Sequence, residues 1–209
     1  DIGASRDGTN PNFDLIRDFA EECKMPLCYG GGIKSYADAS RIIALGVEKV
    51  AVGSLIFEDK GVIKEIIEAI GSQSLVCVID VKKNKLFGGY DAYLKNGTKK
   101  QKIKLSQLLQ DMINLGVGEI IINNIDRDGL MTGYDLKLFE FVKDRVCMPI
   151  TMLGGAGCAE HIKSLVNEAV TVGAACGSWF VFKGQYRAVL ISYPSEELKL
   201  EITKQLQVS

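Results

Sequence analysis

The chain has 209 residues, 47% of them hydrophobic, which is enough to bury a sizeable core in one large domain or two small ones. Its 25 Lys and Arg residues balance 26 Asp and Glu residues, so no global field favours nucleic acid or a membrane surface, and any anionic ligand must be held locally. Six cysteines without a CxxC pair, and the lack of any stretch typical of a membrane span or a signal peptide, favour a protein that stays in the reducing cytoplasm.

Short apolar runs alternate with amphipathic segments from residue 26 onward. Gly46, Gly71 and Gly116 stand where a glycine should end a helix. This order predicts a parallel sheet covered by helices, and because no Pro- or Ser-rich linker divides the chain, it predicts one domain over 1–209. Strands are predicted over 26–30, 49–53, 74–81, 119–125, 149–155 and 173–178, and helices over 36–46, 62–71, 104–116, 135–146 and 159–169.

One segment departs from this alternation. Residues 83–102, "KNKLFGGYDAYLKNGTKKQK", combine glycine turns with alternating aromatic residues, which predicts a β-hairpin with Asn96-Gly97 as a turn. The hairpin would be an insertion on the sheet or barrel. The lysines at its two ends are either solvated charge or a means of steering an anionic substrate.

An internal repeat relates the two halves of the chain. "DGTNPNFDL" (7–15) and "DGLMTGYDL" (128–136) open with Asp-Gly and close with aromatic-Asp-Leu at the same spacing. Glycine clusters follow both segments: the interval from 30–32 to Gly53-Ser54 equals the interval from 154–156 to Gly177-Ser178. Each half thus supplies a strand that ends in glycines and, one unit later, a strand that ends in Gly-Ser at the start of a helix.

The repeated glycines predict two phosphate sites. Glycine lets a ligand approach the backbone, and N–H groups at a helix N-terminus attract phosphate. If the strands close into a barrel, both sites lie at its mouth, where a ligand with a phosphate at each end would fit. The alternative is that the glycines only form tight strand-to-helix turns. A Rossmann dinucleotide site is weaker, because neither cluster completes GxGxxG.

Several single residues are candidates for chemistry. Asp80 ends the apolar run of "VCVID", so its carboxylate is expected at a strand end in a partly desolvated mouth, where it would serve as an acid or base or else cap the next loop. Asp128 would form an Asx-turn or bind substrate hydroxyls. His161 is expected to be a solvated helix residue, since no Ser or Cys beside it forms a nucleophile and base pair. No metal ligand spacing is present, and no cofactor is predicted.

With the repeat, "YGGGIK", "VIDV", "IDRDGLMTGYDL" and "LGGAG" in this order, the chain resembles the cyclase subunit of imidazole glycerol phosphate synthase over nearly all of its length. That resemblance implies a (βα)8 TIM barrel of two half-barrels, with the first unit and most of the second missing, since "DIGAS" looks like the end of the second strand. It also implies a glutaminase partner whose ammonia passes through the barrel to a bis-phosphorylated ribulosyl substrate, giving imidazole glycerol phosphate.

The resemblance assigns roles residue by residue. Asp80 matches one of two catalytic aspartates, and the other would lie on the missing first strand. Lys49 and Glu119 match members of a charged ammonia gate on the face opposite the active site, although they are otherwise an ordinary surface ion pair. The phosphate-binding matches are Gly32, Gly53 and Ser54 for one site, and Asp128, Gly129, Gly155, Gly177 and Ser178 for the other.

Some residues differ from the family pattern. Gly53 replaces an Asn, Asn123-Asn124 replaces Thr-Ser, and Leu153 replaces a small hydroxyl residue. The tail "RAVLISYPS" is closer to paralogues found with surface-polysaccharide genes, which are thought to supply ammonia for amidating a sugar. Two alternatives to the cyclase therefore stay open: this ammonia-channelling paralogue, and a phosphosugar isomerase on the same fold that needs no glutaminase.

Overall fold

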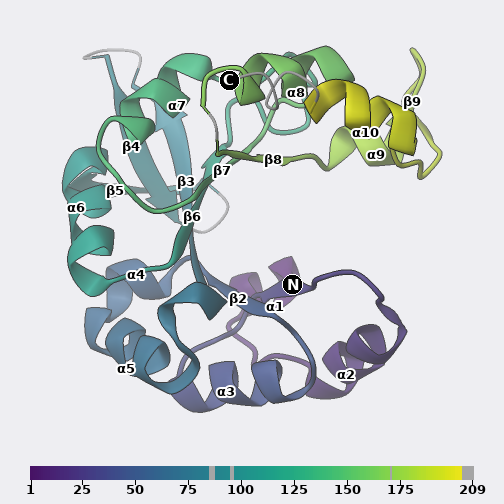
Figure 1. Ribbon diagram of the computed structural model, residues 1–209. Helices are drawn as coiled ribbons and strands as arrows, with labels where there is room; N and C mark the ends of the chain where they lie inside the picture. The colour runs from purple at the N-terminus through teal and green to yellow at the C-terminus, as the bar shows by residue number, and fades with distance from the viewer. Residues whose placement is uncertain (85–87, 95–96, 170, 204–209) are drawn as a thin grey trace.

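The computed structural model describes residues 1–84, 88–94, 97–169 and 171–203 (Figure 1). Six parallel strands within these residues form one sheet in the order β1-β2-β3-β6-β7-β8, so each strand pairs with the next parallel strand along the chain. The sheet curls, with β1 and β8 at its two edges. The strands are β1 (Cys28–Gly30), β2 (Lys49–Val52), β3 (Leu75–Lys83), β6 (Glu119–Asn124), β7 (Ile150–Leu153) and β8 (Gly173–Ala175).

Helices between the strands cover the convex face of this sheet. Gly71 and Gly116 end α5 and α6 with positive φ angles of 82° and 76°, as the sequence predicts. The curled α/β arrangement confirms the predicted fold class as part of a (βα)8-type barrel. The main helices are α2 (Phe13–Glu22), α3 (Tyr36–Ala44), α5 (Lys60–Ile70), α6 (Leu105–Leu115), α7 (Leu136–Lys143) and α8 (Ala159–Val166).

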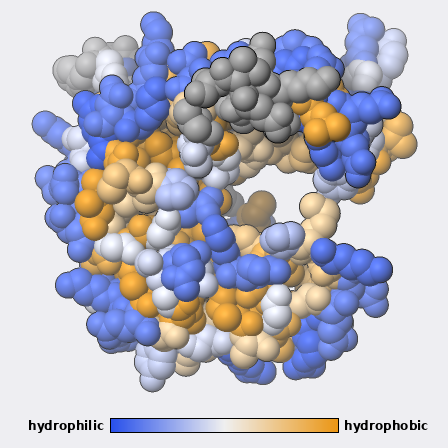
Figure 2. Space-filling view, in the orientation of Figure 1, coloured by the Kyte–Doolittle hydropathy of each residue, from blue (hydrophilic) through white to orange (hydrophobic). Residues whose placement is uncertain are grey.

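Successive residues along each strand lie in two different environments. Residues such as Val50, Ile79 and Ile120 are fully buried against the helices and form the core. Their neighbours on the other face, among them Asp80 and Asn123, are half-buried and face the hollow of the curl. The space-filling view shows this hollow opening to one side, between the N-terminal and C-terminal parts of the chain (Figure 2).

The predicted hairpin is present. β4 (Tyr90–Leu94) pairs antiparallel with β3 and with β5 (Lys99–Lys104), so the insertion extends the sheet from the end of β3. Gly97 has the positive φ of 78° expected of a turn glycine, whereas Asn96 lies outside the described residues.

The N-terminus differs from the expectation. Residues Ile2–Asp7 form a short helix, α1, and are not the end of a strand. Asp1 caps this helix, because its Oδ1 accepts a hydrogen bond from the Ala4 amide at 3.0 Å. The amino group of Asp1 donates to the carbonyl of Gly30, which places Asp1 beside the end of β1.

The two repeats fold differently where their sequences match. Helix α2 begins at Phe13 with Asn12 as its cap, whereas α7 begins at Leu136 with Asp135 as its cap. Asp14 and Asp135 align in sequence, so the helix start shifts by two residues between the halves. Asp14 is exposed, and Asp135 is half-buried.

The glycine clusters are also offset by one residue. Gly31 and Gly32 have φ angles of 122° and 72°, and the glycines with positive φ in the second cluster are Gly154 and Gly155, at 97° and 107°. The sequence interval pairs Gly30 with Gly154, but Gly30 is the last residue of β1 while Gly154 follows the end of β7.

The C-terminal part forms short elements beside α8. Helix α10 packs on α8, where Lys163 and Glu201 form an ion pair of 2.6 Å. Within the described residues no helix has the length and apolar character to cross a membrane. The elements are α9 (Ser178–Val181), β9 (Phe182–Lys183), β10 (Ala188–Val189) and α10 (Glu196–Thr203); α4 (Leu55–Glu58) and a 3-10 turn at Ser72–Ser74 lie earlier.

Candidate functional site

Asp80 lies near the carboxyl end of β3, where the parallel register sets it opposite Asn123 of β6. The Asn123 Nδ2 group donates a hydrogen bond to Asp80 Oδ1 at 2.9 Å. Burial raises the pKa of Asp80; the Asn123 hydrogen bond and the Lys82 charge oppose this, and the Asp128 charge adds to it. The carboxylate is therefore held in place and tuned towards proton exchange.

A cavity of about 360 Å³ opens beside Asp80. Gly32, Gly53 and Ser54, the three residues predicted for the first phosphate site, line the same cavity as Asp80. Gly32 must be glycine, because its φ is 72° and an added Cβ would lie 2.6 Å from the Thr9 carbonyl oxygen. Gly53 is not forced in this way, since a Cβ there would meet only Val78 O at 3.6 Å.

A helix begins at each of the two Gly-Ser pairs, Gly53-Ser54 and Gly177-Ser178, as predicted. Ser54 caps α4, and Gly177 caps α9. Each helix has only four residues, and the Ser54 side chain makes no capping hydrogen bond to α4. In the first site the Ser54 hydroxyl is thus not used by the helix, and it lines the cavity.

The cavity wall contains polar residues that the sequence analysis did not assign. Tyr93, Lys99 and Gln101 come from the β4–β5 hairpin, and Ser5 and Arg6 come from α1. The lysines at the ends of the hairpin favour steering of an anionic substrate, and this is the one sequence signal that points to Lys99. The structure thus brings the hairpin to the wall of the candidate site.

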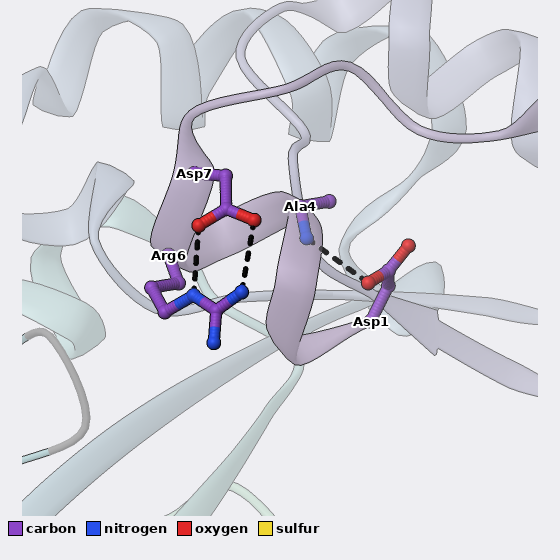
Figure 3. A network of polar contacts seen from close by, with 4 residues as sticks. All are labelled: Asp1, Ala4, Arg6 and Asp7. Atoms are coloured by element: carbon purple, nitrogen blue, oxygen red, sulfur yellow. Dashed lines mark hydrogen bonds and ion pairs between the residues drawn. The ribbon is translucent and has the colours of Figure 1, made fainter.

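Arg6 forms a bidentate pair with its neighbour Asp7, with N···O distances of 2.7 and 3.0 Å (Figure 3). The repeat in fact extends one residue further than the Asp-Gly pair, because Arg127-Asp128-Gly129 matches Arg6-Asp7-Gly8. Arg127 acts differently from Arg6. Its Nη1 group donates to the carbonyls of Gly133 and Tyr134 and so fixes the loop before α7.

The residues predicted for the second phosphate site lie after β6, β7 and β8. Gly129 faces Ser178, since a Cβ on Gly129 would be 3.9 Å from the Ser178 hydroxyl oxygen. Gly155 packs on the loop of Gly133, whose amide donates to the Gly155 carbonyl at 2.8 Å. Around Gly177 there is open space.

Asp128 is exposed and close enough to Asp80 for its charge to raise the pKa of that carboxyl. The Asx-type contact expected of Asp128 belongs instead to Asn124, whose Oδ1 accepts from the Asp126 amide at 3.1 Å. Ligand binding by the exposed Asp128 side chain stays a prediction.

Lys49 and Glu119 start β2 and β6, at the opposite end of the strands from Asp80. They form an ion pair of 2.6 Å, with side-chain exposures of 41% and 17%. Thr151 was not predicted here; its hydroxyl donates to the second Glu119 oxygen at 2.8 Å. Beside the pair, Cys28 is an exposed residue of β1, but the protein atoms packed around its thiol and the Glu119 charge raise its pKa to about 11.

His161 lies on α8, as expected, and is partly exposed. Its Nδ1 accepts a hydrogen bond from the Gly157 amide at 3.1 Å, which orders the turn after β7. Across the part of the chain that the structure describes, no three His, Cys, Asp or Glu side chains gather as metal ligands.

Comparisons with known proteins agree with this geometry. The family model described as "Histidine biosynthesis protein" matches residues 1–187. A Vibrio vulnificus protein, provisionally named imidazole glycerol phosphate synthase subunit hisF3, is 50% identical over 200 residues, covering 95% of this chain and 76% of the relative. A Leptospira borgpetersenii protein, provisionally named as the same synthase's subunit HisF, is 49% identical over 93% of this chain and 77% of its own length.

A more distant relative carries that name without qualification. The imidazole glycerol phosphate synthase subunit HisF of Streptococcus gordonii is 33% identical over 180 residues, covering 86% of this chain and 71% of the relative. The family match spans both halves of the repeat and the strand ends that form the candidate site. The chain belongs to the family of histidine biosynthesis proteins.

Proposed function

We propose that this protein is the cyclase/lyase subunit of an imidazole glycerol phosphate synthase and acts in histidine biosynthesis. It uses ammonia from a glutaminase partner on a bis-phosphorylated ribulosyl substrate, forming imidazole glycerol phosphate and an aminoimidazole carboxamide nucleotide. Support comes from the family and from relatives named for this synthase.

The observation that carries the proposal is the shared cavity. A half-buried carboxylate, Asp80, lies in one cavity with Gly32, Gly53 and Ser54. Backbone N–H groups and a free hydroxyl suit one phosphate, while the matched residues Gly129 and Ser178 offer the same groups to a second. This pairing favours a ligand with two phosphates and its reacting part near Asp80.

Asp80 acts as an acid or base in this reaction. When ammonia adds to a carbonyl carbon, its nitrogen must lose protons and the carbonyl oxygen must gain one. A carboxyl whose pKa is raised by burial exchanges protons nearer to neutral pH than an exposed one.

The partner would bind at the other end of the strands. Ammonia released there meets the Lys49–Glu119 pair first and then passes along the concave face of the sheet to Asp80.

The experiment is turnover of the ribulosyl substrate with ammonium supplied, comparing the wild type with Asp80→Asn. Wild-type protein should form imidazole glycerol phosphate. The variant should lose at least about 100-fold in turnover, the usual contribution of a general acid or base, while its substrate Kd stays within a few-fold. Retained turnover in the variant would remove Asp80 from the mechanism.

A second candidate is the sugar-amidation paralogue, in which the barrel conducts ammonia to another enzyme. Gly53 and Leu153 favour it, because neither offers the side-chain hydroxyl or amide that the cyclase pattern has at these positions. A folded wild-type protein that activates the glutaminase but does not turn over the ribulosyl substrate would support this candidate.

A further inference from the structure

The wall of the cavity beside Asp80 holds one positive charge that no carboxylate matches. The charged residues that line this cavity are Arg6, Glu58, Asp80 and Lys99. The Arg6 guanidinium forms its bidentate pair with Asp7 (Figure 3), whereas the Lys99 ammonium has no ion pair within the described residues. A phosphate that enters beside the Glu58 and Asp80 carboxylates needs a cation to offset their repulsion, and Lys99 is the available one.

Lys99 lies on the side of the cavity where α4 begins. A second cavity, of about 390 Å³, adjoins the first, and Phe57, Lys99 and Gln101 line both. These three residues therefore form the boundary between the two cavities. Phe57 belongs to α4, the helix that follows Ser54 directly. Its contact with the same two cavities places Lys99 near the Ser54 end of the cavity beside Asp80.

The backbone of Lys99 is held in this place by contacts on both sides of it. Two residues earlier, Gly97 is buried, and its carbonyl accepts a hydrogen bond from Lys82 Nζ at 2.8 Å. Two residues later, Gln101 Nε2 donates to the Lys99 carbonyl at 3.0 Å. The register of β4 and β5 pairs Lys99 with Leu94, which also lines the cavity. The long lysine side chain thus extends from a fixed point in the cavity wall.

Two neighbouring lysines are engaged elsewhere. Lys82 donates to the Gly97 carbonyl, and its Nζ atom lies 4.8 Å from the centre of the Tyr93 ring. Lys100 forms an ion pair of 2.6 Å with Asp91. Neither of these two lysines lines the cavity beside Asp80.

We propose that the Lys99 ammonium group binds the phosphate held by Gly53 and Ser54, so that the hairpin contributes a substrate-binding residue. The inference rests on the proposed function, since this phosphate belongs to the bis-phosphorylated substrate. An ammonium group donates charge-assisted hydrogen bonds to phosphate oxygens. Its charge also offsets the repulsion between the phosphate and the Asp80 carboxylate.

Lysines on β5 also have an ordinary structural role. Among the described strands β5 pairs only with β4, and lysines on such an edge prevent it from pairing with another chain. Lys102 fits this role, because it is exposed like Lys99 but lines only the second cavity. Lys102 is therefore the matched control for Lys99.

The first test compares the kinetics of Lys99→Met and Lys102→Met. Each variant removes one positive charge from β5, so any long-range attraction of anions falls equally. We expect K99M to raise the KM for the ribulosyl substrate about tenfold, the loss of one charge-assisted hydrogen bond, with kcat within about twofold. K102M should leave both constants within about twofold, and Lys99→Arg, which keeps the charge, should stay within about threefold. Equal increases of KM in K99M and K102M would mean that these lysines only steer anions and would overturn the inference.

A binding measurement keeps this inference separate from the proposed function. The probe is inorganic phosphate, followed through the backbone amide resonances of Gly53 and Ser54 for the first site and of Gly177 and Ser178 for the second. In K99M the Kd reported by the first pair should rise about tenfold, while the Kd reported by the second pair stays unchanged.

Two results of this titration would overturn the inference even if the enzyme turns over its substrate. One is no phosphate-dependent shift of Gly53 and Ser54 in the wild type, and the other is an unchanged Kd for that pair in K99M. Phosphate binding that depends on Lys99, in a protein without ribulosyl turnover, would keep the inference and reject the cyclase.

Discussion

At the scale of single residues, Gly155 and Gly177 belong to the same predicted phosphate site but are glycine for different reasons. Gly155 has a φ of 107°, and an added Cβ would lie 2.1 Å from the Gly133 carbonyl oxygen. Gly177 has a φ of −109° and open space around it. The first is required by the fold, and the second leaves room for a ligand.

Gly155→Ala should therefore lower the free energy of unfolding by roughly 2–4 kcal/mol, from backbone strain and a clash that must be relieved. Gly177→Ala should change it by less than about 1 kcal/mol. Denaturant unfolding of both variants gives these values. Equal losses would mean that Gly177 is also held by the fold, contrary to its open surroundings.

At the scale of elements, the Asp135 side chain forms hydrogen bonds that connect α7, β4 and β6. Its Oδ1 caps α7 by accepting from the Leu138 amide at 3.2 Å, and its Oδ2 accepts from Tyr90 of β4 at 3.0 Å and from Asn124 of β6 at 3.2 Å. The repeat aligns Asp135 with Asp14, whose side chain is 84% exposed and forms an ion pair with Arg17 of the same helix.

Asp135→Ala should cost about 3 kcal/mol of unfolding free energy, because it removes the helix cap and leaves the Tyr90 and Asn124 donors without an acceptor. Asp14→Ala should cost less than about 0.5 kcal/mol. Thermal or urea unfolding of the pair compares two aligned aspartates in one protein. A large loss in D14A would show that the halves are more alike than their contacts indicate.

The sequence predicts elements better than contacts between them. Periodicity and glycine positions predict the six strands and the ends of α5 and α6. Asp80 lies near the end of the parallel pairing of β3 with β6, but β3 itself continues to Lys83 because the hairpin pairs with it. Helix α2 was missed, although its repeat partner α7 was predicted. The Asp80–Asn123 contact could not be predicted, because it depends on the register of two strands whose residues are 43 positions apart.

The same limit applies to the cavity. Gly32, Gly53 and Ser54 were found through the repeat, whereas Tyr93 and Gln101 reach the cavity only because the hairpin folds back from β3. A local pattern records which side of one element is buried. It does not record which residues of a distant element complete a site.

At the scale of the whole molecule, the amino ends of the strands are the proposed entry for ammonia, and the Asp80 end is the proposed reaction site. Variants of the Lys49–Glu119 pair test whether ammonia passes from the first end to the second. Lys49→Met and Glu119→Gln each remove one charge. If the pair controls entry from the partner, each variant should lower glutamine-dependent turnover several-fold and leave turnover with saturating ammonium within about twofold, because bulk ammonia can enter at the open Asp80 end.

Lys60→Met is a matched control for this experiment. The Lys60–Asp111 pair has the same 2.6 Å length and similar side-chain exposures of 47% and 16%, but it joins α5 and α6 on the convex face. Partly exposed pairs of this kind contribute about 1 kcal/mol or less to the free energy of unfolding, so K60M and K49M should be similarly stable.

A parallel fall of glutamine- and ammonium-dependent turnover in K49M would make the Lys49 pair structural. A selective fall in K49M, with K60M unchanged, would instead locate ammonia entry at the amino ends of β2 and β6, because only there does a charge of equal exposure affect the nitrogen source.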